Sequence, residues 1–203
     1  MTMTDDYLDK VYRLRTDAER RALYDDWAGQ YDGDLTAQGY VTPARCAAVV
    51  AGSALPKDAP ILDMGCGTGL SGRALAAEGF TRIDGADVST GMMAEARKSG
   101  VYARLIDLSG ATAPANHYAA VVAAGVIGTG AAPPDVFDQC LDLLSPGGLF
   151  CFSFNDHARA VPAYTDRLDA AVTTGKARIL AQEMGDHIIG LGSRAMVYLL
   201  ERQ

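Results

Sequence analysis

The amino-acid sequence predicts an α/β protein with a doubly wound, mostly parallel sheet. A short apolar run, Ile61–Met64, leads into a loop with glycine at every second position (65–69) and then into a helical segment. Further apolar runs at Tyr118–Gly125 and Leu149–Phe154 lack the alternation of a half-exposed strand, which is typical of central strands buried on both faces. Helical segments lie between these runs, so parallel strands joined by crossover helices are expected.

Three helices are predicted before the first strand. Apolar residues at helical spacing indicate a helix over residues 5–15, with Thr4 as its cap. Thr16-Asp17 begins a second helix, which the run Asp32-Gly33-Asp34 is expected to end. A third helix begins at Thr42-Pro43, because proline is well tolerated in a first helical turn, and runs to about residue 51.

An aromatic stripe lies on the second helix, where Tyr24, Trp27 and Tyr31 share one face. One interpretation is that these side chains pack into the core. The other is that they form the inner face of a lid that closes over a ligand. The stripe by itself does not decide between the two.

From residue 60 onward, predicted strands and helices alternate. Gly79 and Gly100 stand where a glycine commonly ends a helix, and Ser89 can cap the helix that follows it. The expected strands cover residues 61–64, 81–87, 101–106, 118–125 and 149–154, and the expected helices cover 70–78, 90–99 and 133–144.

The pattern changes after the fifth strand, which a turn at residues 145–148 precedes. A helix over 162–174 is followed by two strand-like segments, 177–189 and 194–201, with Gly190-Leu191-Gly192 between them. Strands joined by so short a turn are antiparallel. The sheet is therefore expected to have five parallel strands plus a C-terminal antiparallel hairpin.

Length and composition favour one domain, with residues 1–52 as a helical cap or lid and residues 60–203 as the α/β core. The net charge of −7 and the lack of a basic patch disfavour a nucleic-acid partner. Four cysteines without a C-x-x-C pair are typical of a reducing compartment, and no apolar run is long enough to span a membrane. We expect a cytoplasmic monomer or homodimer that binds neither membrane nor nucleic acid.

Ligands of open α/β sheets bind outside the carboxyl ends of the strands. That edge should gather Asp63 and the glycine loop after the first strand, Asp87 after the second and Asp107 after the third. Gly125 follows the fourth strand, and Asn155-Asp156-His157 follows the fifth. A binding site is therefore expected there.

Asp87 suggests which kind of ligand this site binds. A carboxylate at the end of the second strand can accept hydrogen bonds from both ribose hydroxyls, which indicates an adenosine cofactor but does not distinguish NAD from S-adenosylmethionine. The alternative is an aspartate that only caps a helix or faces solvent.

Two further carboxylates favour S-adenosylmethionine. Asp63 lies two residues before the first loop glycine, where it would repel a pyrophosphate but suits an ammonium and a sulfonium, directly or through water. Asp107 could accept a hydrogen bond from an adenine amino group. Residues 67–72 also fit the dinucleotide-binding pattern G-x-G-x-x-G, but that match begins late after the strand and is weak evidence alone.

Three segments resemble the class I S-adenosylmethionine-dependent methyltransferases, whose fold is Rossmann-like. They are Leu62–Gly69, Gly85–Ser89 with the following Met92 and Met93, and Pro146–Gly148. The resemblance implies S-adenosylmethionine as the cofactor and S-adenosylhomocysteine as its product.

The N-terminal segment resembles one branch of these enzymes. Tyr24–Asp32, followed by Gly39-Tyr40, is similar to the signature of the small-molecule branch, and most similar to the Williams–Beuren-region (methyltransferase-like 27) type. The resemblance implies methyl transfer to a small-molecule acceptor by SN2-type displacement, beneath N-terminal helices that fold over the cofactor.

The resemblance also implies a role for each matching residue. Asp87 would bind the ribose, and Val88 and Met92 would flank the adenine. Tyr31 would lie near the methionine carboxylate, and carbonyl groups at 123–125 would receive the methionyl ammonium. The full set of implied cofactor-binding residues is Tyr24, Trp27, Tyr31, Asp63, Gly65, Cys66, Gly67, Thr68, Gly69, Asp87, Val88, Met92, Asp107, Leu108, Ala124 and Gly125.

His157 is the candidate general base, because it follows the fifth strand at the ligand-binding edge and has Asp156 beside it. The alternative is that Asp156 caps the next helix and His157 lies in its first turn. No metal site is expected. Residues 125–130 lack the acid or Asn-Pro-Pro-Tyr set that nucleic-acid and amide N-methyltransferases use.

Two other functions are considered. An NAD-dependent oxidoreductase would need a Tyr-x-x-x-Lys or equivalent set, and none is found around the fourth and fifth strands. A non-catalytic S-adenosylmethionine-binding protein is also compatible with the sequence, because no general base is obvious.

Overall fold

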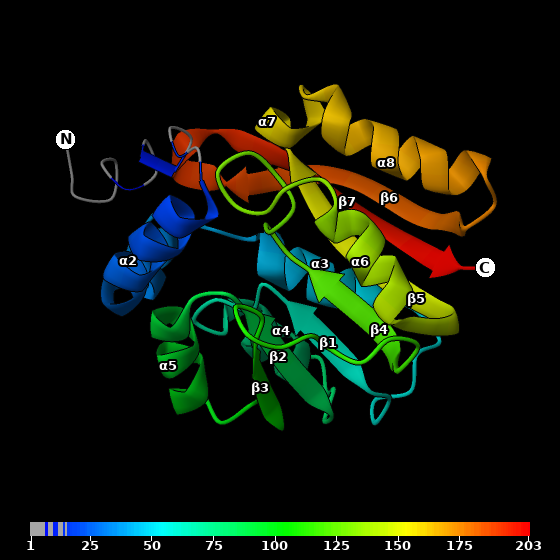
Figure 1. Cartoon of the computed structure of the whole chain (residues 1–203), viewed down its shortest axis with the longest axis horizontal. Helices are drawn as coiled ribbons and strands as arrows, with labels where there is room; N and C mark the ends of the chain where they lie inside the picture. The colour runs from blue at the N-terminus through cyan, green and yellow to red at the C-terminus, as the bar shows by residue number, and fades with distance from the viewer. Residues whose placement is uncertain (1–6, 8–9, 12–13, 15) are drawn as a thin grey trace.

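A seven-stranded sheet lies at the centre of the computed structural model, which describes residues 7, 10, 11, 14 and 16–203 (Figure 1). The strand order is β3-β2-β1-β4-β5-β7-β6. Strands β1 to β5 run parallel, and β7 pairs antiparallel with both β5 and β6. The strands are β1 (Ile61–Met64), β2 (Ile83–Asp87), β3 (Arg104–Asp107), β4 (Tyr118–Ala123), β5 (Leu144–Asn155), β6 (Ala177–Ile188) and β7 (Ser193–Arg202). The predicted five parallel strands and terminal hairpin are confirmed.

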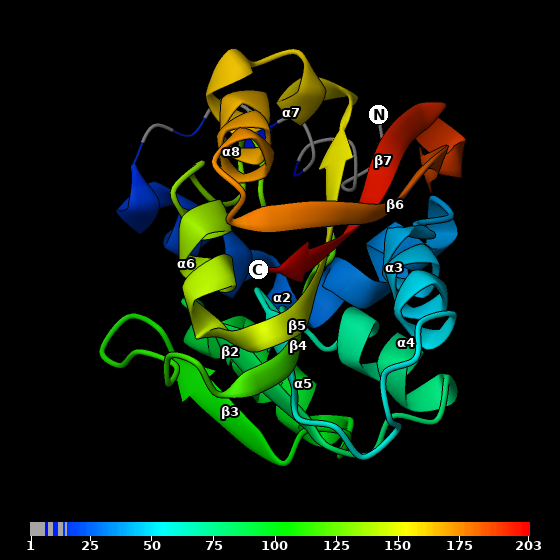
Figure 2. The ribbon, with the colours of Figure 1, turned by 90° about the vertical axis from the view of Figure 1, so that its right-hand side faces the viewer.

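Helices cover both faces of the sheet, with α3 and α4 on one side and α6 and α8 on the other (Figure 2). Alternate residues of β4 serve both faces, because Val121 packs with α6 and α8 whereas Val122 packs with α3 and α4. The helices are α2 (Asp17–Ala37), α3 (Thr42–Ala51), α4 (Leu70–Ala77), α5 (Thr90–Lys98), α6 (Val136–Leu143), α7 (Asp156–Arg159) and α8 (Pro162–Thr173). No helix in the described ranges is long and apolar enough to cross a membrane.

Helix α2 is longer than predicted. It continues through Asp32-Gly33-Asp34 to Ala37, whereas the sequence suggested a break there. Glycine costs about 1 kcal/mol inside a helix, and tertiary contacts offset this cost. Leu35 is buried beyond the glycine, and the indole nitrogen of Trp27 donates to Asp34 Oδ2 over 2.7 Å. The helix predicted over 5–15, with its Thr4 cap, lies largely outside the described residues.

Several other boundaries differ from the predictions. β2 begins at Ile83 and β3 at Arg104, each later than expected, because the ladder between neighbouring strands starts only there. Helix α6 begins at Val136, after the proline pair rather than at it. β5 begins earlier than predicted, at Leu144. The predicted turn at 145–148 is a bulge within it, since the β4–β5 register jumps across these residues.

The segment 38–41 joins the end of α2 to the C-terminal hairpin. Tyr40 forms an antiparallel bridge with Ile188. The backbone N–H of Val41 donates to the carbonyl of His187 over 3.0 Å, and that of Gly190 donates to Gln38 over 2.8 Å. The base of the N-terminal cap is therefore held by the end of β6 and by the turn that follows it.

The connection between β3 and β4, residues 108–117, contains no helix. The other crossovers between parallel strands contain α4, α5 and α6. Helix α6 consequently has a loop, and not a helix, as its neighbour on the side of β3. This arrangement leaves room for the cavity described next.

Candidate functional site

The glycine loop after β1 has an unusual backbone. Gly65, Gly67 and Gly69 all have positive φ angles, of 66°, 53° and 96°, which side chains disfavour. A Cβ on Gly65 would lie 2.6 Å from Val126, whereas a Cβ on Gly67 would meet no protein atom within 4 Å. Packing therefore requires glycine at position 65, while at position 67 the bare backbone faces open space.

Asp87 lies at the end of β2 and organises this loop. Its Oδ2 accepts the backbone N–H of Gly67, and its Oδ1 accepts that of Ser89, both over 2.8 Å. Burial raises the pKa of Asp87, and these backbone hydrogen bonds oppose the rise. A carboxylate has about four lone-pair sites, so two can still accept hydrogen bonds from a ligand.

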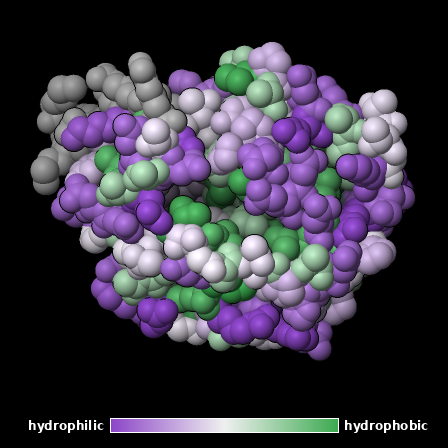
Figure 3. Space-filling view, viewed as in Figure 1, coloured by the Kyte–Doolittle hydropathy of each residue, from purple (hydrophilic) through white to green (hydrophobic). Residues whose placement is uncertain are grey.

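A cavity of about 810 Å³ lies above the glycine loop, at the carboxyl ends of the strands. It is near the upper end of the range of roughly 300–1,000 Å³ found for ligand pockets. Figure 3 shows a hollow with hydrophobic residues inside and hydrophilic residues around its rim. The predicted cofactor-binding residues that line the cavity are Tyr24, Tyr31, Gly65, Gly67, Asp87, Val88, Met92, Leu108, Ala124 and Gly125.

Trp27 does not line the cavity. Only 1% of its surface is exposed, and its ring stacks on Tyr7 at 5.1 Å and meets the edge of Tyr31 at 4.6 Å. Trp27 thus follows the core-packing interpretation, whereas its helical neighbours Tyr24 and Tyr31 face the cavity. Burial raises the pKa of Tyr31 well above its ordinary value, so this hydroxyl keeps its proton and can donate.

Three loop residues stand behind the cavity rather than in its wall. Cys66 is buried, and burial raises the pKa of its thiol. Thr68 is buried and donates its hydroxyl to Asp32 of α2. Gly69 is the N-cap of α4, where its left-handed backbone turns the chain into the helix.

Asp107 also lies outside the cavity wall, although Leu108 and Ser109 beside it contribute to that wall. Its Oδ1 accepts both the backbone N–H and the hydroxyl of Ser109, at 2.8 and 2.6 Å. These hydrogen bonds lower the pKa of Asp107, and the nearby positive charge of Arg21 adds to the effect. The carboxylate is therefore a fixed acceptor at the rim.

Asp63 is fully buried and does not reach the cavity wall. Its Oδ2 accepts hydrogen bonds from the hydroxyls of Ser71 and Tyr102, each at 2.6 Å, while no described residue donates to Oδ1. Burial raises the pKa of Asp63 from 3.8 to about 6, against the effect of these two donors. A Cβ at Gly72 would collide with Tyr102, so the last glycine of the G-x-G-x-x-G match makes room for a tyrosine and not for a pyrophosphate.

Replacing Asp63 with asparagine should change how stability depends on pH. Because the pKa is higher in the folded state, the proton on Asp63 stabilises the fold below about pH 4, and this contribution is lost as the pH rises through about 6. The loss amounts to about 3 kcal/mol, at about 1.4 kcal/mol per tenfold change in proton affinity. Urea unfolding measures the free energy of unfolding of both proteins at pH 4 and pH 7. The stability of Asp63→Asn relative to the wild type should be higher at pH 7 than at pH 4 by about that amount. A stability difference that stays constant with pH would contradict this assignment.

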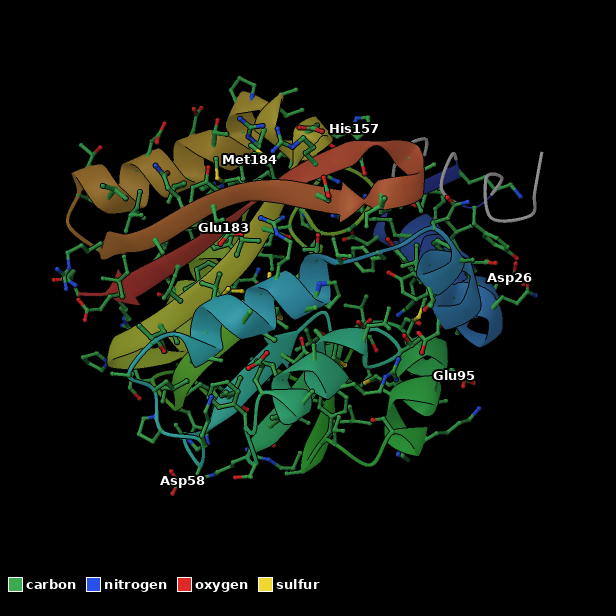
Figure 4. The ribbon with its side chains drawn as sticks, turned by 180° about the vertical axis from the view of Figure 1, so that it is seen from behind. Asp26, Asp58, Glu95, His157, Glu183 and Met184 are labelled. Atoms are coloured by element: carbon green, nitrogen blue, oxygen red, sulfur yellow. The ribbon has the colours of Figure 1, made fainter. Side chains whose placement is uncertain are left out.

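His157 is exposed on α7, away from the cavity wall (Figure 4). The cap of α7 is Asn155, whose Oδ1 accepts the N–H of Ala158 over 2.9 Å, and not Asp156 as the alternative interpretation supposed. Asp156 instead accepts the N–H of Arg194 over 3.0 Å. The structure therefore does not bring His157 to the site.

Tyr40 and His187 lie at the end of β4, and sequence reasoning assigned neither of them a role in the site. Tyr40 donates its hydroxyl to the Ala124 carbonyl over 3.4 Å, and a Cβ at Gly125 would collide with that hydroxyl. His187 is 5.3 Å from the Tyr40 ring and shares a 2.8 Å hydrogen bond with Thr42. Burial lowers the pKa of His187 to about 4, so the ring is neutral at pH 7.

Two aspartates fasten α2 over the site. Asp25 accepts the hydroxyl of Ser89 over 2.6 Å and the N–H of Gly91 over 2.9 Å, at the start of α5. Asp32 accepts from Thr68 and forms a 2.5 Å ion pair with Arg73. Both aspartates belong to the N-terminal signature, but the sequence does not reveal their partners, which lie 36 to 66 residues away.

No group of three or more histidine, cysteine or acidic residues in the described part of the chain could hold a metal ion.

The strand–glycine loop–helix unit, the carboxylate on the loop and the cavity above them define a nucleotide-type binding site on an α/β fold. A family model described as a methyltransferase domain matches residues 40–185. The chain therefore belongs to the methyltransferase domain family, which confirms the resemblance noted from the sequence.

The chain is 34% identical to methyltransferase-like protein 27 of Homo sapiens over 167 residues, or 76% of this chain and 67% of that protein. The 1,6-didemethyltoxoflavin-N1-methyltransferase of Burkholderia thailandensis, solved with 1,6-didemethyltoxoflavin and S-adenosylhomocysteine bound, shares the fold. The two structures superpose with a TM-score of 0.66 at 18% sequence identity, and the alignment covers 94% of this chain and 92% of that one. The [4+2]-cyclase SpnF also shares it, with a TM-score of 0.59 at 19% identity, covering 78% of this chain and 80% of that one.

Proposed function

We propose that the protein transfers a methyl group from S-adenosylmethionine to a small-molecule acceptor by SN2-type displacement. The observation that carries this proposal is Asp87, whose carboxylate is held by the N–H of Gly67 beside the bare backbone of the glycine loop. Both residues line the cavity. A ribose placed there would hydrogen-bond to Asp87 while contacting the loop closely.

The other lining residues fit the remaining parts of the cofactor. Val88, Met92 and Leu108 offer apolar contacts for an adenine ring. The methionyl group would lie at the end of β4, near the carbonyl of Ala124 and beneath Tyr31. The Tyr31 hydroxyl, which keeps its proton, would donate to the methionine carboxylate. Asp63 would support the loop from behind, because its carboxylate is sealed from the cavity.

When bound, S-adenosylmethionine supplies an electrophilic methyl group, so the residues of this chain mainly position the acceptor and exclude water. Helix α2 covers the cavity with Tyr24 and Tyr31. Its ties through Asp25 and Asp32 hold the cover in place. Residues 1–52 would then act as the lid of a single methyltransferase domain. The four free, buried cysteines support a reducing, cytoplasmic location.

A non-catalytic or differently reacting S-adenosylmethionine-binding protein is the second candidate. The observation that favours it is the cavity wall, because none of the described residues that line it is a histidine, lysine or cysteine that could act as a base. The cyclase neighbour also supports this second candidate, because a protein named for a different reaction has the same fold.

Calorimetric titration with S-adenosylmethionine, S-adenosylhomocysteine and NAD tests the proposal. We expect both sulfur ligands to bind and NAD not to bind. The pyrophosphate of NAD would lie on the glycine loop, and the carboxylate of Asp63 directly behind that loop would repel it. Incubation with S-adenosylmethionine and small molecules, followed by mass spectrometry, should reveal a product heavier by one CH₂ group. Binding of NAD without binding of either sulfur ligand would refute the proposal. Binding without any methylated product would favour the second candidate.

A further inference from the structure

The peptide group between Ala124 and Gly125 is held on both of its polar sides. It follows β4 directly, and both of its residues line the cavity. Its carbonyl, on Ala124, accepts the hydroxyl of Tyr40 over 3.4 Å, and its N–H, on Gly125, donates to Ser153 Oγ over 2.8 Å. Two side chains that are distant in the sequence therefore bind the two polar groups of one peptide.

Gly125 makes such support necessary. It lies in a turn and has a φ angle of 73°. Glycine adopts positive and negative φ angles about equally, and type I and type II turns differ in the orientation of the peptide that precedes this position. Without other contacts the peptide could turn over and exchange the positions of its carbonyl and its N–H. The hydrogen bonds from Tyr40 and to Ser153 favour one of the two orientations.

Tyr40 reaches this peptide from a fixed support. Its backbone N–H donates to the carbonyl of Leu35 over 3.0 Å, and its backbone forms the bridge to Ile188. Its ring meets His187 edge-on, with the two planes at 89°. Its hydroxyl lies so close to Gly125 that a Cβ there would be 2.1 Å away. The end of β6 thus places the Tyr40 hydroxyl against the peptide.

Neither Tyr40 nor Ser153 is among the described residues that line the cavity, and only 2% of Ser153 is exposed. Any effect of these two side chains on a ligand must therefore pass through the peptide that they hold. A carbonyl oxygen has two lone pairs. The oxygen of Ala124 can accordingly accept the Tyr40 hydroxyl and still accept a second donor from the cavity.

We infer that Tyr40 and Ser153 are positioning residues, which orient the Ala124 carbonyl so that it receives the methionyl ammonium of the cofactor. This inference rests on the proposed function. Neither side chain touches the cofactor, and the contribution of each is the orientation of a backbone group. Their loss should weaken the binding of ligands that carry the ammonium and spare a ligand that lacks it.

Two ligands that share their adenosine and sulfur test this inference by calorimetric titration. S-adenosylhomocysteine carries the amino-acid part, and 5′-methylthioadenosine lacks it. Tyr40→Phe should weaken S-adenosylhomocysteine binding about threefold, because its hydrogen bond is long, and Ser153→Ala about tenfold. The double variant should weaken it about 30-fold. Affinity for 5′-methylthioadenosine should stay within about twofold in all three variants, which also shows that the cavity is folded.

Decarboxylated S-adenosylmethionine separates the ammonium from the carboxylate, because it keeps only the ammonium. The double variant should weaken its binding by about the same factor as that of S-adenosylmethionine. Tyr31→Phe should show the opposite pattern and weaken only S-adenosylmethionine, since the Tyr31 hydroxyl would donate to the carboxylate.

Tyr198→Phe is the matched control for the loss of a tyrosine hydroxyl. Tyr198 is a half-buried residue of β7 whose ring stacks on Phe152, and it does not line the cavity. Its variant should bind all of these ligands as the wild type does.

Gly125→Ala tests the contact with Tyr40 itself. In the wild type the added methyl group would collide with the Tyr40 hydroxyl, whereas in Tyr40→Phe the nearest ring carbon would lie 3.3 Å away. Gly125→Ala should therefore lower the unfolding temperature less in the Tyr40→Phe background than in the wild type.

The outcomes separate the two proposals. If the wild type binds neither S-adenosylmethionine nor S-adenosylhomocysteine, the proposed function fails and the inference fails with it. If the wild type binds them, three results each overturn the inference alone. The double variant binds S-adenosylhomocysteine normally, or it loses affinity for 5′-methylthioadenosine by the same factor, or it binds decarboxylated S-adenosylmethionine normally.

Discussion

Replacing Asp87 with alanine is expected to weaken S-adenosylmethionine binding by at least about 100-fold. In the proposed binding mode the variant would remove the acceptor for two ribose hydroxyls, and hydrogen bonds to a charged group contribute about 1.5–3 kcal/mol each. It also frees the backbone N–H groups of Gly67 and Ser89, which Asp87 holds in the native loop. Calorimetric titration of the variant measures the loss, and thermal unfolding shows whether the fold persists.

Asp58→Ala is the matched control for this experiment. Asp58 is exposed in the loop before β1 and does not line the cavity, so its variant should bind as the wild type does (Figure 4). Asp87→Asn should fall between the wild type and alanine, because the amide keeps one acceptor oxygen. Unchanged affinity in Asp87→Ala would remove this residue from the cofactor site.

Removing both ties of α2 should speed the release of S-adenosylhomocysteine about 20-fold. The variant Asp25→Ala with Asp32→Ala loses the acceptors for Ser89, Gly91, Thr68 and Arg73. Together these partly exposed interactions are worth about 2 kcal/mol. We assume that the product can leave only when α2 is open. Destabilising the closed state by that amount raises the ratio of open to closed protein about 20-fold, and the release rate rises with it. Stopped-flow fluorescence of Trp27 provides the rate.

Asp26→Ala is the control on the same helix, because Asp26 accepts from Tyr7 and contacts neither the glycine loop nor α5 through its side chain (Figure 4). Its release rate should match the wild type. Equal rates in the double variant and the control would show that α2 does not gate the site.

The sequence was most informative where local patterns and global structure agree. The apolar runs predicted β4 and the inner part of β5, because central parallel strands are buried on both faces and need no alternation. The start of α2 at Thr16 was predicted from capping chemistry, and the structure shows a full capping box with Glu19. The end of α2 was not predictable in this way, because the helix is held beyond Gly33 by tertiary contacts.

The conformation of the glycine loop and the position of Asp87 at the end of β2 were also predictable, since a tight loop with positive φ angles needs its glycines in a fixed order after a strand. Their contacts with a cofactor stay a prediction. Trp27 was not resolved by its pattern, because helical spacing shows which residues share a face but not how deep each one lies. Asp63 was expected near the ligand, and only the packing of Tyr102 over Gly72 shows that the carboxylate is closed off.

The contacts that sequence reasoning missed join distant parts of the chain. His187 meets Thr42 across 145 residues, and Tyr40 meets Ala124 across 84. Nothing local marks such partners, because each depends on the hairpin returning to the base of the cap. His157 is the opposite case, a residue that was predicted to lie at the site but does not. Its position after β5 suggested a place at the ligand-binding edge, whereas α7 directs it to the surface.

The β3–β4 connection has a consequence for how this protein could diversify. Loops accept insertions and deletions more readily than strands, and the β3–β4 connection lines the cavity through residues between 108 and 113 without forming any of the strands. Lengthening or replacing this connection would reshape the cavity wall while the sheet and Asp87 stay in place. Descendants of one ancestral gene could thereby acquire new substrates through changes of chain length at a single point, and a library of loop grafts at residues 110–115 would be the corresponding starting material for engineering.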